Sequence, residues 1–156
     1  MYKLVKLEKK EYEEFTKNHE KSHFLHSYAW GEVSKSRGFT PHYLGVKNNN
    51  KIVATMLLLQ KPLVLGYSYF YVPRGFTMDY NDKKLLEFIT KELAIYTKQY
   101  KSLYYIIDPD IKLQTIDIDA NVIDGENNYE LVARGKYDAL DIIDDALYNK
   151  FNKESK

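Results

Sequence analysis

The chain has no cysteine among its 156 residues, which excludes disulfide bonds, thiolate nucleophiles and cysteine-based zinc sites. Its seven glycines are spread out, and no two of them lie within six residues of each other. A Gly-rich turn, whose backbone N–H groups could close around a pyrophosphate, is therefore missing. We accordingly expect no cofactor.

Long apolar runs are also missing. The longest, residues 52–59, is interrupted by Thr55 and is far too short to cross a bilayer. The N-terminal segment MYKLVKLEKKEYEEF places acids and lysines where a signal peptide needs a continuous apolar stretch. These features predict a cytoplasmic chain.

Charge of one sign does not dominate, because the net charge is +1 and creates no global field toward nucleic acid or membrane. Locally, residues 1–51 hold ten Lys or Arg against six Asp or Glu, whereas residues 108–124 hold five Asp against Lys112. The basic segment could meet phosphates or form a solvated helix face. Tyrosine is abundant, with 15 against seven Phe and one Trp, which suits a groove for sugars or peptides but also fits a compositional bias.

The hydrophobic pattern predicts strands and helices in a definite order. The longest helix is expected after Asn81, its presumed cap, because apolar residues recur every three or four positions up to Tyr100. A shorter helix is expected after Ser27, with Trp30 and Val33 on its apolar face and Gly38 at its end. The expected strands are residues 2–7, 41–47, 51–61, 67–72 and 102–107; residues 8–19, 127–135 and 138–151 are expected to be helical, and residues 108–124 to be loop or weak strand.

This order predicts an α/β (α+β) fold, an acetyltransferase-like (GNAT-like) mixed sheet flanked by helices. A hairpin turning at residues 48–50 comes first, and a β-α-β unit with parallel strands follows. No linker or repeat divides the chain, so residues 1–156 are expected to form a single domain. Fold does not settle function, which has to come from the motifs.

Three motifs occur in register: FLHSYAWGEVSKSRGF at residues 24–39, YFYVPRGFTMDY at 69–80 and YYIIDPDI at 104–111. Together they resemble the Fem-type (FemABX) family of peptidoglycan bridge-forming aminoacyltransferases, with the match strongest over residues 24–111. The resemblance covers the N-terminal acetyltransferase-like half only. Family members are much longer, with a second such half and often a helical arm that resembles a tRNA-contacting coiled coil.

The resemblance implies a function in cell wall synthesis: tRNA-dependent aminoacyl transfer to the stem peptide of a peptidoglycan precursor, with this chain supplying the precursor-binding half. The implied partners are a lipid-linked or UDP-linked muropeptide, and aminoacyl-tRNA if a second half is supplied. Peripheral membrane association through the lipid-linked substrate and self-association through apolar surface on the terminal helices are further expectations. Two alternatives stay open, a standalone acyl-CoA-dependent N-acyltransferase and a non-catalytic precursor-binding module.

The same motifs supply the candidate site residues. Asp108 ends a strand in the family's Ile-Asp-Pro motif and is the candidate base for the incoming amine, with turn capping as its competing role. Lys35 and Arg37 are candidate phosphate ligands or surface cations. Arg74 could hold a stem-peptide carboxylate or the carbonyls of its own loop. Two tyrosines, Tyr71 and Tyr104, are expected to line the groove.

A metal site is not expected. Of the four histidines, three straddle a predicted helix end, and no acidic residue completes a recognisable ligand pattern (His19, His23, His26 and His42).

Overall fold

The computed structural model describes residues 1–111, 114–116 and 122–125. It divides into two units, Met1–Asp110 and Ile111–Lys156, and each is treated by itself. The helices expected at residues 127–135 and 138–151 lie outside the described residues, as does the self-association surface expected on them. That all 156 residues form one domain stays a prediction.

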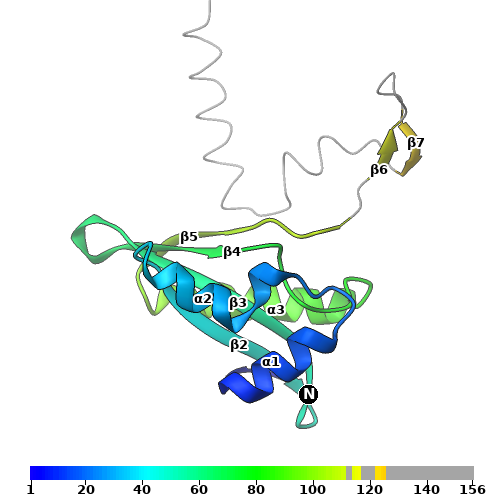
Figure 1. Cartoon of the computed structure of the whole chain (residues 1–156), viewed down its shortest axis with the longest axis horizontal. Coiled ribbons are helices and arrows are strands. Elements are labelled where there is room, and N and C mark those ends of the chain that lie inside the picture. The colour runs from blue at the N-terminus through cyan, green and yellow to red at the C-terminus, as the bar shows by residue number, and fades with distance from the viewer. Residues whose placement is uncertain (112–113, 117–121, 126–156) are drawn as a thin grey trace, which may run out of the picture. The chain divides into compact units, whose positions relative to one another are not determined.

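The first unit is built on a five-stranded mixed sheet with the strand order β1-β2-β3-β4-β5 (Figure 1). All neighbours are antiparallel except β4 and β5, which are parallel. The bounds are β1 Tyr2–Lys6, α1 Lys9–Asn18, η1 Phe24–His26, α2 Tyr28–Lys35, β2 Thr40–Asn48, β3 Lys51–Pro62, η2 Val64–Gly66, β4 Ser68–Val72, α3 Lys83–Lys98 and β5 Ser102–Ile107. The predicted acetyltransferase-like order of strands and helices is thus confirmed.

In the second unit, the described residues form a short antiparallel hairpin, β6 Gln114–Ile116 and β7 Val122–Gly125. This is the weak-strand alternative expected for residues 108–124.

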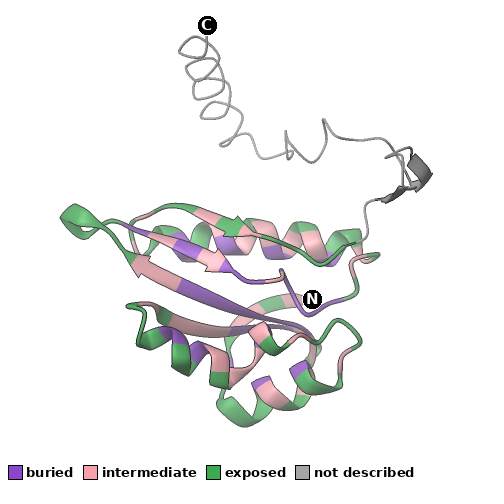
Figure 2. Ribbon diagram, turned by 45° about the horizontal axis from the view of Figure 1, so that its top comes forward, coloured by how far each residue is buried: buried purple, intermediate pink, exposed green. Residues whose placement is uncertain are grey.

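Helices cover both faces of the sheet, α3 on one side and α1 with α2 on the other (Figures 1 and 2). The strand β3 explains why, because its residues 54–59 are buried on both faces. Alternate side chains point to opposite sides: Met56 and Leu58 join the core under α3, while Leu57 and Leu59 join the core under α1 and α2. The predicted apolar stripe of α3 is confirmed, since Leu85, Ile89 and Leu93 are buried.

The first helices are fixed by buried polar contacts. The ring of Tyr12 in α1 is fully buried, and its hydroxyl donates to the carbonyl of His26 at 2.7 Å, which ties α1 to the turn before α2. Ser27 caps α2 as predicted, accepting from the N–H of Trp30. The expected apolar face of α2 is wrong in part: Val33 is 52% exposed. The tight contact of Gly31 with the Tyr43 ring turns the helix so that small residues face the sheet.

The N-terminus of α3 differs from expectation. The cap is Asp82 and not Asn81: the N–H of Leu85 donates to Asp82 Oδ1 at 2.9 Å, and the hydroxyl of Tyr2 donates to Oδ2 at 3.0 Å. The hydrogen bond from Leu85 is the main cause of a lowered pKa at Asp82. A charged carboxylate of the chain itself therefore occupies the positive end of this helix.

Within the described residues, no helix is both long and apolar enough to cross a bilayer.

The ring of His42 supports the contact between β2 and α3. Its Nδ1 lies 2.8 Å from the Tyr96 hydroxyl and its Nε2 lies 3.0 Å from Gln60 Oε1. Burial lowers the pKa of His42, and it lowers the pKa of His26 as well. Both rings are therefore held neutral at pH values at which exposed histidines begin to charge.

This burial predicts a loss of stability in mild acid. Below about pH 6.5 the unfolded chain binds protons that the folded histidines resist, so the free energy of unfolding falls by up to about 1.4 kcal/mol per pH unit for each such group. Urea unfolding of the chain at pH 7.5 and pH 5.5 measures the fall. His42→Gln is expected to reduce it, and His19→Gln, at a partly exposed position, serves as the control. An equal fall in His42→Gln and the unmodified chain would refute this role.

Candidate functional site

Part of one face of the sheet is not covered by the described helices. Helices α1 and α2 pack over β2 and β3, whereas the same side of β4 and β5 carries a row of half-exposed side chains. We call this surface the tyrosine face; it consists of Tyr69, Tyr71, Tyr104 and Ile106. Tyr69 stacks on Tyr104 with ring centroids 5.4 Å apart, and Ile106 is 48% exposed. The two predicted groove tyrosines, Tyr71 and Tyr104, thus lie on one face.

One end of the tyrosine face joins three of the predicted residues. Because β4 and β5 are parallel, the residues that follow them meet at one edge of the sheet. The hydroxyl of Tyr71 donates to Asp108 Oδ2 at 2.9 Å, and the backbone N–H of Arg74 donates to Asp108 Oδ1 at 2.6 Å. Burial and the Asp108 carboxylate raise the pKa of Tyr71 to about 12, so this phenol keeps its proton and remains a donor. The carboxylate is held by both oxygens and faces solvent.

The turn after β4 is strained where it meets Asp108. Arg74 has φ 55° and Gly75 has φ 74°, both in the left-handed region. For arginine this conformation costs about 1–2 kcal/mol, whereas glycine adopts it freely. Any side chain at residue 75 would also collide with Pro109, whose Cα lies 2.9 Å from the position of an added Cβ. The strain directs the Arg74 N–H at the carboxylate, a placement typical of functional turns.

The side chain of Arg74 serves the loop that follows β5. Its Nη2 pairs with Asp110 Oδ1 at 2.6 Å, which fixes the Asp-Pro-Asp segment beside the turn. The pair is partly exposed, so it contributes at most about 1 kcal/mol. The geometry supports the anchoring role considered for Arg74, but its Nε is buried and has no hydrogen-bond partner among the described residues.

Arg74 also lines a small polar pocket of about 140 Å³ between the residue 20–26 loop and the turn. The Nδ1 of His26 lies 3.0 Å from the Thr77 hydroxyl. Both His26 and Arg74 line this pocket. The pocket lining is Glu20, Lys21, Ser22, His23, His26, Arg74, Phe76, Tyr80 and Asp110.

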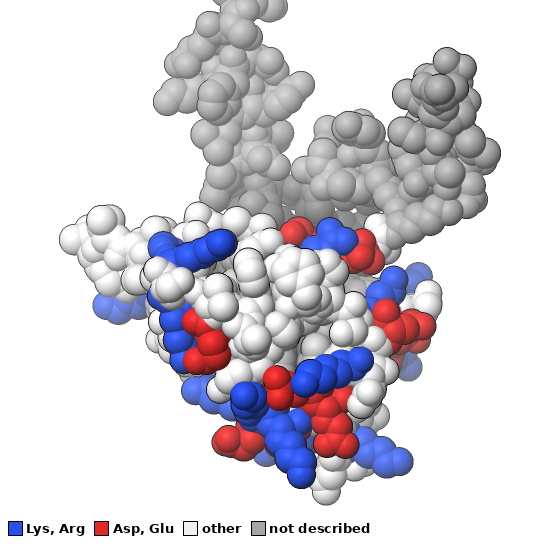
Figure 3. All heavy atoms as spheres, viewed as in Figure 1, with Lys and Arg blue, Asp and Glu red and all other residues white. Residues whose placement is uncertain are grey.

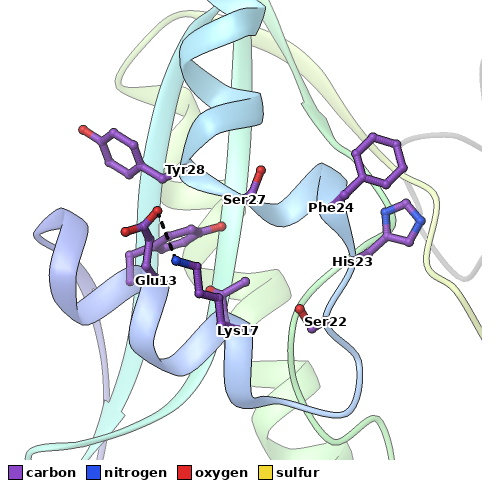
Figure 4. Close-up of a pocket in the computed structure, with 9 residues that line it drawn as sticks. Glu13, Lys17, Ser22, His23, Phe24, Ser27 and Tyr28 are labelled. Atoms are coloured by element: carbon purple, nitrogen blue, oxygen red, sulfur yellow. Dashed lines mark ion pairs between the residues drawn. The ribbon is translucent and has the colours of Figure 1, made fainter.

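A second, mostly apolar pocket of about 160 Å³ lies between α1 and the start of α2 (Figure 4). Glu13 and Lys17 form an ion pair of 3.8 Å on one side of it, and His23 and Phe24 lie on the other. None of the predicted site residues lines this pocket.

The opposite end of the tyrosine face is cationic. Lys61 reaches over the Phe39 ring at 4.7 Å and donates to the backbone carbonyl of Arg37. The Phe39 ring lies edge-on to Tyr69, with centroids 6.5 Å apart, and so links these cations to the tyrosine face. The sequence has no Asp or Glu from residue 33 to residue 78.

The two predicted phosphate ligands are not brought to Asp108. Lys35 pairs with Glu32 at 2.6 Å on the exposed side of α2, and the Arg37 guanidinium lies over the Trp30 ring at 5.4 Å. Sequence reasoning missed Lys61. Its position two residues after Leu59 places it on the same face of the strand as Leu57 and Leu59, which indicates a lysine at the edge of a buried face. Sequence reasoning also missed Tyr69, although this residue lies two positions before Tyr71 and so on the same face of the predicted strand. It missed a role for His26 as well.

Metal ligands do not gather in the described part of the chain. Over residues 1–111, 114–116 and 122–125, no three His, Asp or Glu side chains are placed to share an ion.

Known relatives match most of this chain but only part of their own length. The Aminoacyltransferase FemA proteins of Staphylococcus aureus strain bovine RF122 / ET3-1 and strain MW2 are each 33% identical to it over 127 residues. The aligned segment covers 81% of this chain and 30% of each FemA chain. The chain therefore spans less than a third of the length of these relatives.

Solved structures agree with this placement. A crystal structure of FemX superimposes with a TM-score of 0.64 at 25% identity, over 76% of this chain and 28% of that chain. A ribosomal-protein-alanine N-acetyltransferase from Brucella melitensis biovar Abortus 2308 shares the fold, with a TM-score of 0.50 at 12% identity over 70% of this chain and 80% of its own. A FemAB family model matches residues 7–134, and together with the FemA sequences this shows that the chain belongs to the FemAB family.

Proposed function

We propose that this chain binds the muropeptide acceptor in tRNA-dependent aminoacyl transfer, a step of peptidoglycan bridge formation. The observation that carries the proposal is the carboxylate of Asp108, held by Tyr71 and by the Arg74 N–H at one end of an open aromatic face. The similarity to Aminoacyltransferase FemA supports the same reaction class. The chain is proposed to supply the precursor-binding half, because it matches less than a third of FemA.

The tyrosine face gives the acceptor a direction. A diphosphate would lie at the cationic end, near the ammonium of Lys61, in a stretch of sequence without acids from residue 33 to residue 78. Sugar rings would lie against Tyr69 and Tyr104, whose flat faces suit them. The strand β4 then rises about 3.3 Å per residue, or roughly 13 Å from Ser68 to Val72, toward Asp108. The peptide would arrive there.

At Asp108 the acceptor amine would lose its proton. The amine nitrogen attacks the ester carbonyl of aminoacyl-tRNA, a new C–N bond forms, and the bond to the tRNA 3′-oxygen breaks. Asp108 takes the proton from the amine and can return one to the departing oxygen. Tyr71 and the Arg74 N–H keep the carboxylate in place, and positioning supplies much of the rate because the ester is already activated.

The acyl-CoA alternative is disfavoured by the cap of α3. A pyrophosphate would need the free N–H groups of this helix start, where Asp82 already accepts from Leu85 and carries negative charge. The second alternative, a non-catalytic module, would bind the precursor in the same way. It would support no aminoacyl transfer, whether alone or together with a partner chain.

The proposed donor, aminoacyl-tRNA, would be met in the cytoplasm, so the proposal retains a cytoplasmic site of action. The acceptor can be lipid-linked or UDP-linked, since both present the same phosphates and peptide to the tyrosine face.

Binding of the precursor is the first test. Titration with UDP-MurNAc-pentapeptide is expected to give saturable NMR shifts along the tyrosine face and at Asp108. Lys61→Gln is expected to weaken binding about 10- to 100-fold, since it removes a charged hydrogen bond to phosphate. Lys17→Gln, in the ion pair on α1, is the matched control. Equal affinities for these two variants would overturn the proposed phosphate end.

The role of Asp108 can be isolated with a modified acceptor. Acetylating the side-chain amine of the precursor removes the ammonium, and the unmodified chain is expected to bind this form about tenfold more weakly. In Asp108→Asn the two acceptors should bind alike. Discrimination that survives the substitution would show that the amine does not reach Asp108.

Acetyl-CoA separates the main proposal from its acyl-CoA rival. The capped helix predicts no saturable shifts at the start of α3, even at millimolar acetyl-CoA. Saturable shifts there would establish the rival. Transfer from charged tRNA by the chain alone would in turn contradict the half-domain role.

A further inference from the structure

The connection between β3 and β4 exposes apolar side chains that nothing in the proposed function uses. We call residues 63–67 the apolar loop. Val64 is 81% exposed and Leu65 is 87% exposed, and the flanking Leu63 and Tyr67 are exposed by 39% and 44%. The loop projects from the end of the sheet, as the green extension at the left of Figures 1 and 2.

The apolar loop is fixed in this exposed shape. Its ends are joined by a 2.7 Å hydrogen bond from the N–H of Leu63 to the carbonyl of Tyr67, and the N–H of Tyr67 donates back to Val64. Leu65 has φ 59° and Gly66 has φ 76°, both left-handed. A leucine in this region is strained, and at 87% exposure its side chain gains little burial to offset the strain. The hydrogen-bonded turn therefore presents the two aliphatic side chains to the outside.

Cations surround the base of the apolar loop. Lys61 precedes it and donates to the backbone carbonyl of Arg37, whose guanidinium lies over the Trp30 ring. Lys101 lies directly before β5, and its carbonyl accepts from the N–H of Ser68. The sequence has no acid in residues 33–78 or in residues 93–107, which hold Lys98 and Lys101. Figure 3 shows the projecting loop as uncharged surface with blue side chains at its base.

We propose that the apolar loop inserts into the surface of an anionic lipid bilayer. Exposed aliphatic side chains on a convex tip bury readily among acyl chains, whereas protein partners favour flatter or concave surfaces rich in aromatic rings and Arg. Cations at the base match the depth of anionic headgroups. Tyr67, at the end of the loop, has the amphipathic ring that favours this interface.

Insertion would orient the molecule on the membrane. The apolar loop lies at the amino end of β4, and Asp108 lies beyond its carboxyl end, roughly 13 Å further along the strand at about 3.3 Å per residue. Lys61 and Lys101 would then face the headgroup phosphates, and Asp108 would stand clear of the lipid. This orientation rests on the proposed function, but the insertion itself does not.

Vesicle partitioning tests the insertion. The chain is expected to sediment with phosphatidylglycerol-containing vesicles and far less with pure phosphatidylcholine vesicles. The double variant Val64→Ser/Leu65→Asn should partition at least about tenfold less, because it removes the buried aliphatic area. Asn tolerates the left-handed backbone at residue 65, so the fold should persist. Ile95→Gln, which alters an aliphatic side chain 58% exposed on α3, is the matched control.

A site-specific probe gives a second readout. Because the chain has no cysteine, Leu65→Cys can be labelled at one position with an environment-sensitive fluorophore. A blue shift with phosphatidylglycerol vesicles is expected for this label and not for the same label at Ile95→Cys. Lys61→Gln/Lys101→Gln should remove most of the preference for anionic lipid.

Equal partitioning of the double variant and the unmodified chain would overturn the proposal, as would a label at residue 65 that stays in water. Self-association that Val64→Ser/Leu65→Asn abolishes, without vesicle binding, would assign the apolar loop to a second copy instead. The vesicles contain no muropeptide, so either failure leaves the proposed transfer function untouched.

Discussion

The parallel pairing of β4 with β5 is the constraint on which the rest of the structure depends. It brings the residues after both strands to one edge, where Asp108 meets Tyr71 and the Arg74 N–H. An antiparallel β5 would have carried Asp108 to the opposite end of the sheet. The same pairing aligns Tyr69 with Tyr104, and it leaves the apolar loop at the far end of β4. The proposed transfer site and the proposed membrane contact would thus lie at opposite ends of one strand.

The edge is held rigid from two directions. Gly75 lets Pro109 approach the turn, and Arg74 reaches forward to Asp110. From behind, residue 77 exchanges two backbone hydrogen bonds with Thr55 of β3 and also contacts His26. These contacts connect the turn to the center of the sheet and to the loop before α2. A strained conformation at Arg74 can persist only with such support.

The sequence carried enough information for the elements and for two of their pairings, the β2-β3 hairpin and the parallel pair of β4 and β5, but not for the side-chain contacts between them. The spacing of apolar residues every three or four positions predicted α3, and three consecutive asparagines predicted the β2-β3 turn. Both signals are local in the sequence. The motifs named Asp108, Arg74 and Tyr71, yet their meeting depends on a strand pairing across more than 30 residues. Predictions from local sequence failed where contacts between distant residues determine the structure. The packing of Tyr43 against Gly31 leaves Val33 exposed to solvent, and the hydrogen bond from Tyr2 favours Asp82 over Asn81 as the helix cap. The roles proposed for Lys61 and the apolar loop depend on their position at the end of the sheet, which the sequence pattern did not reveal.

The capped start of α3 has a consequence for how the protein responds to its surroundings. Where a helix terminus is completed by a bound nucleotide, stability rises with the concentration of that ligand. Here the terminus is completed by Asp82, from the same polypeptide. The start of this helix is therefore completed by the polypeptide itself, and its capping hydrogen bond forms at any concentration of ligand.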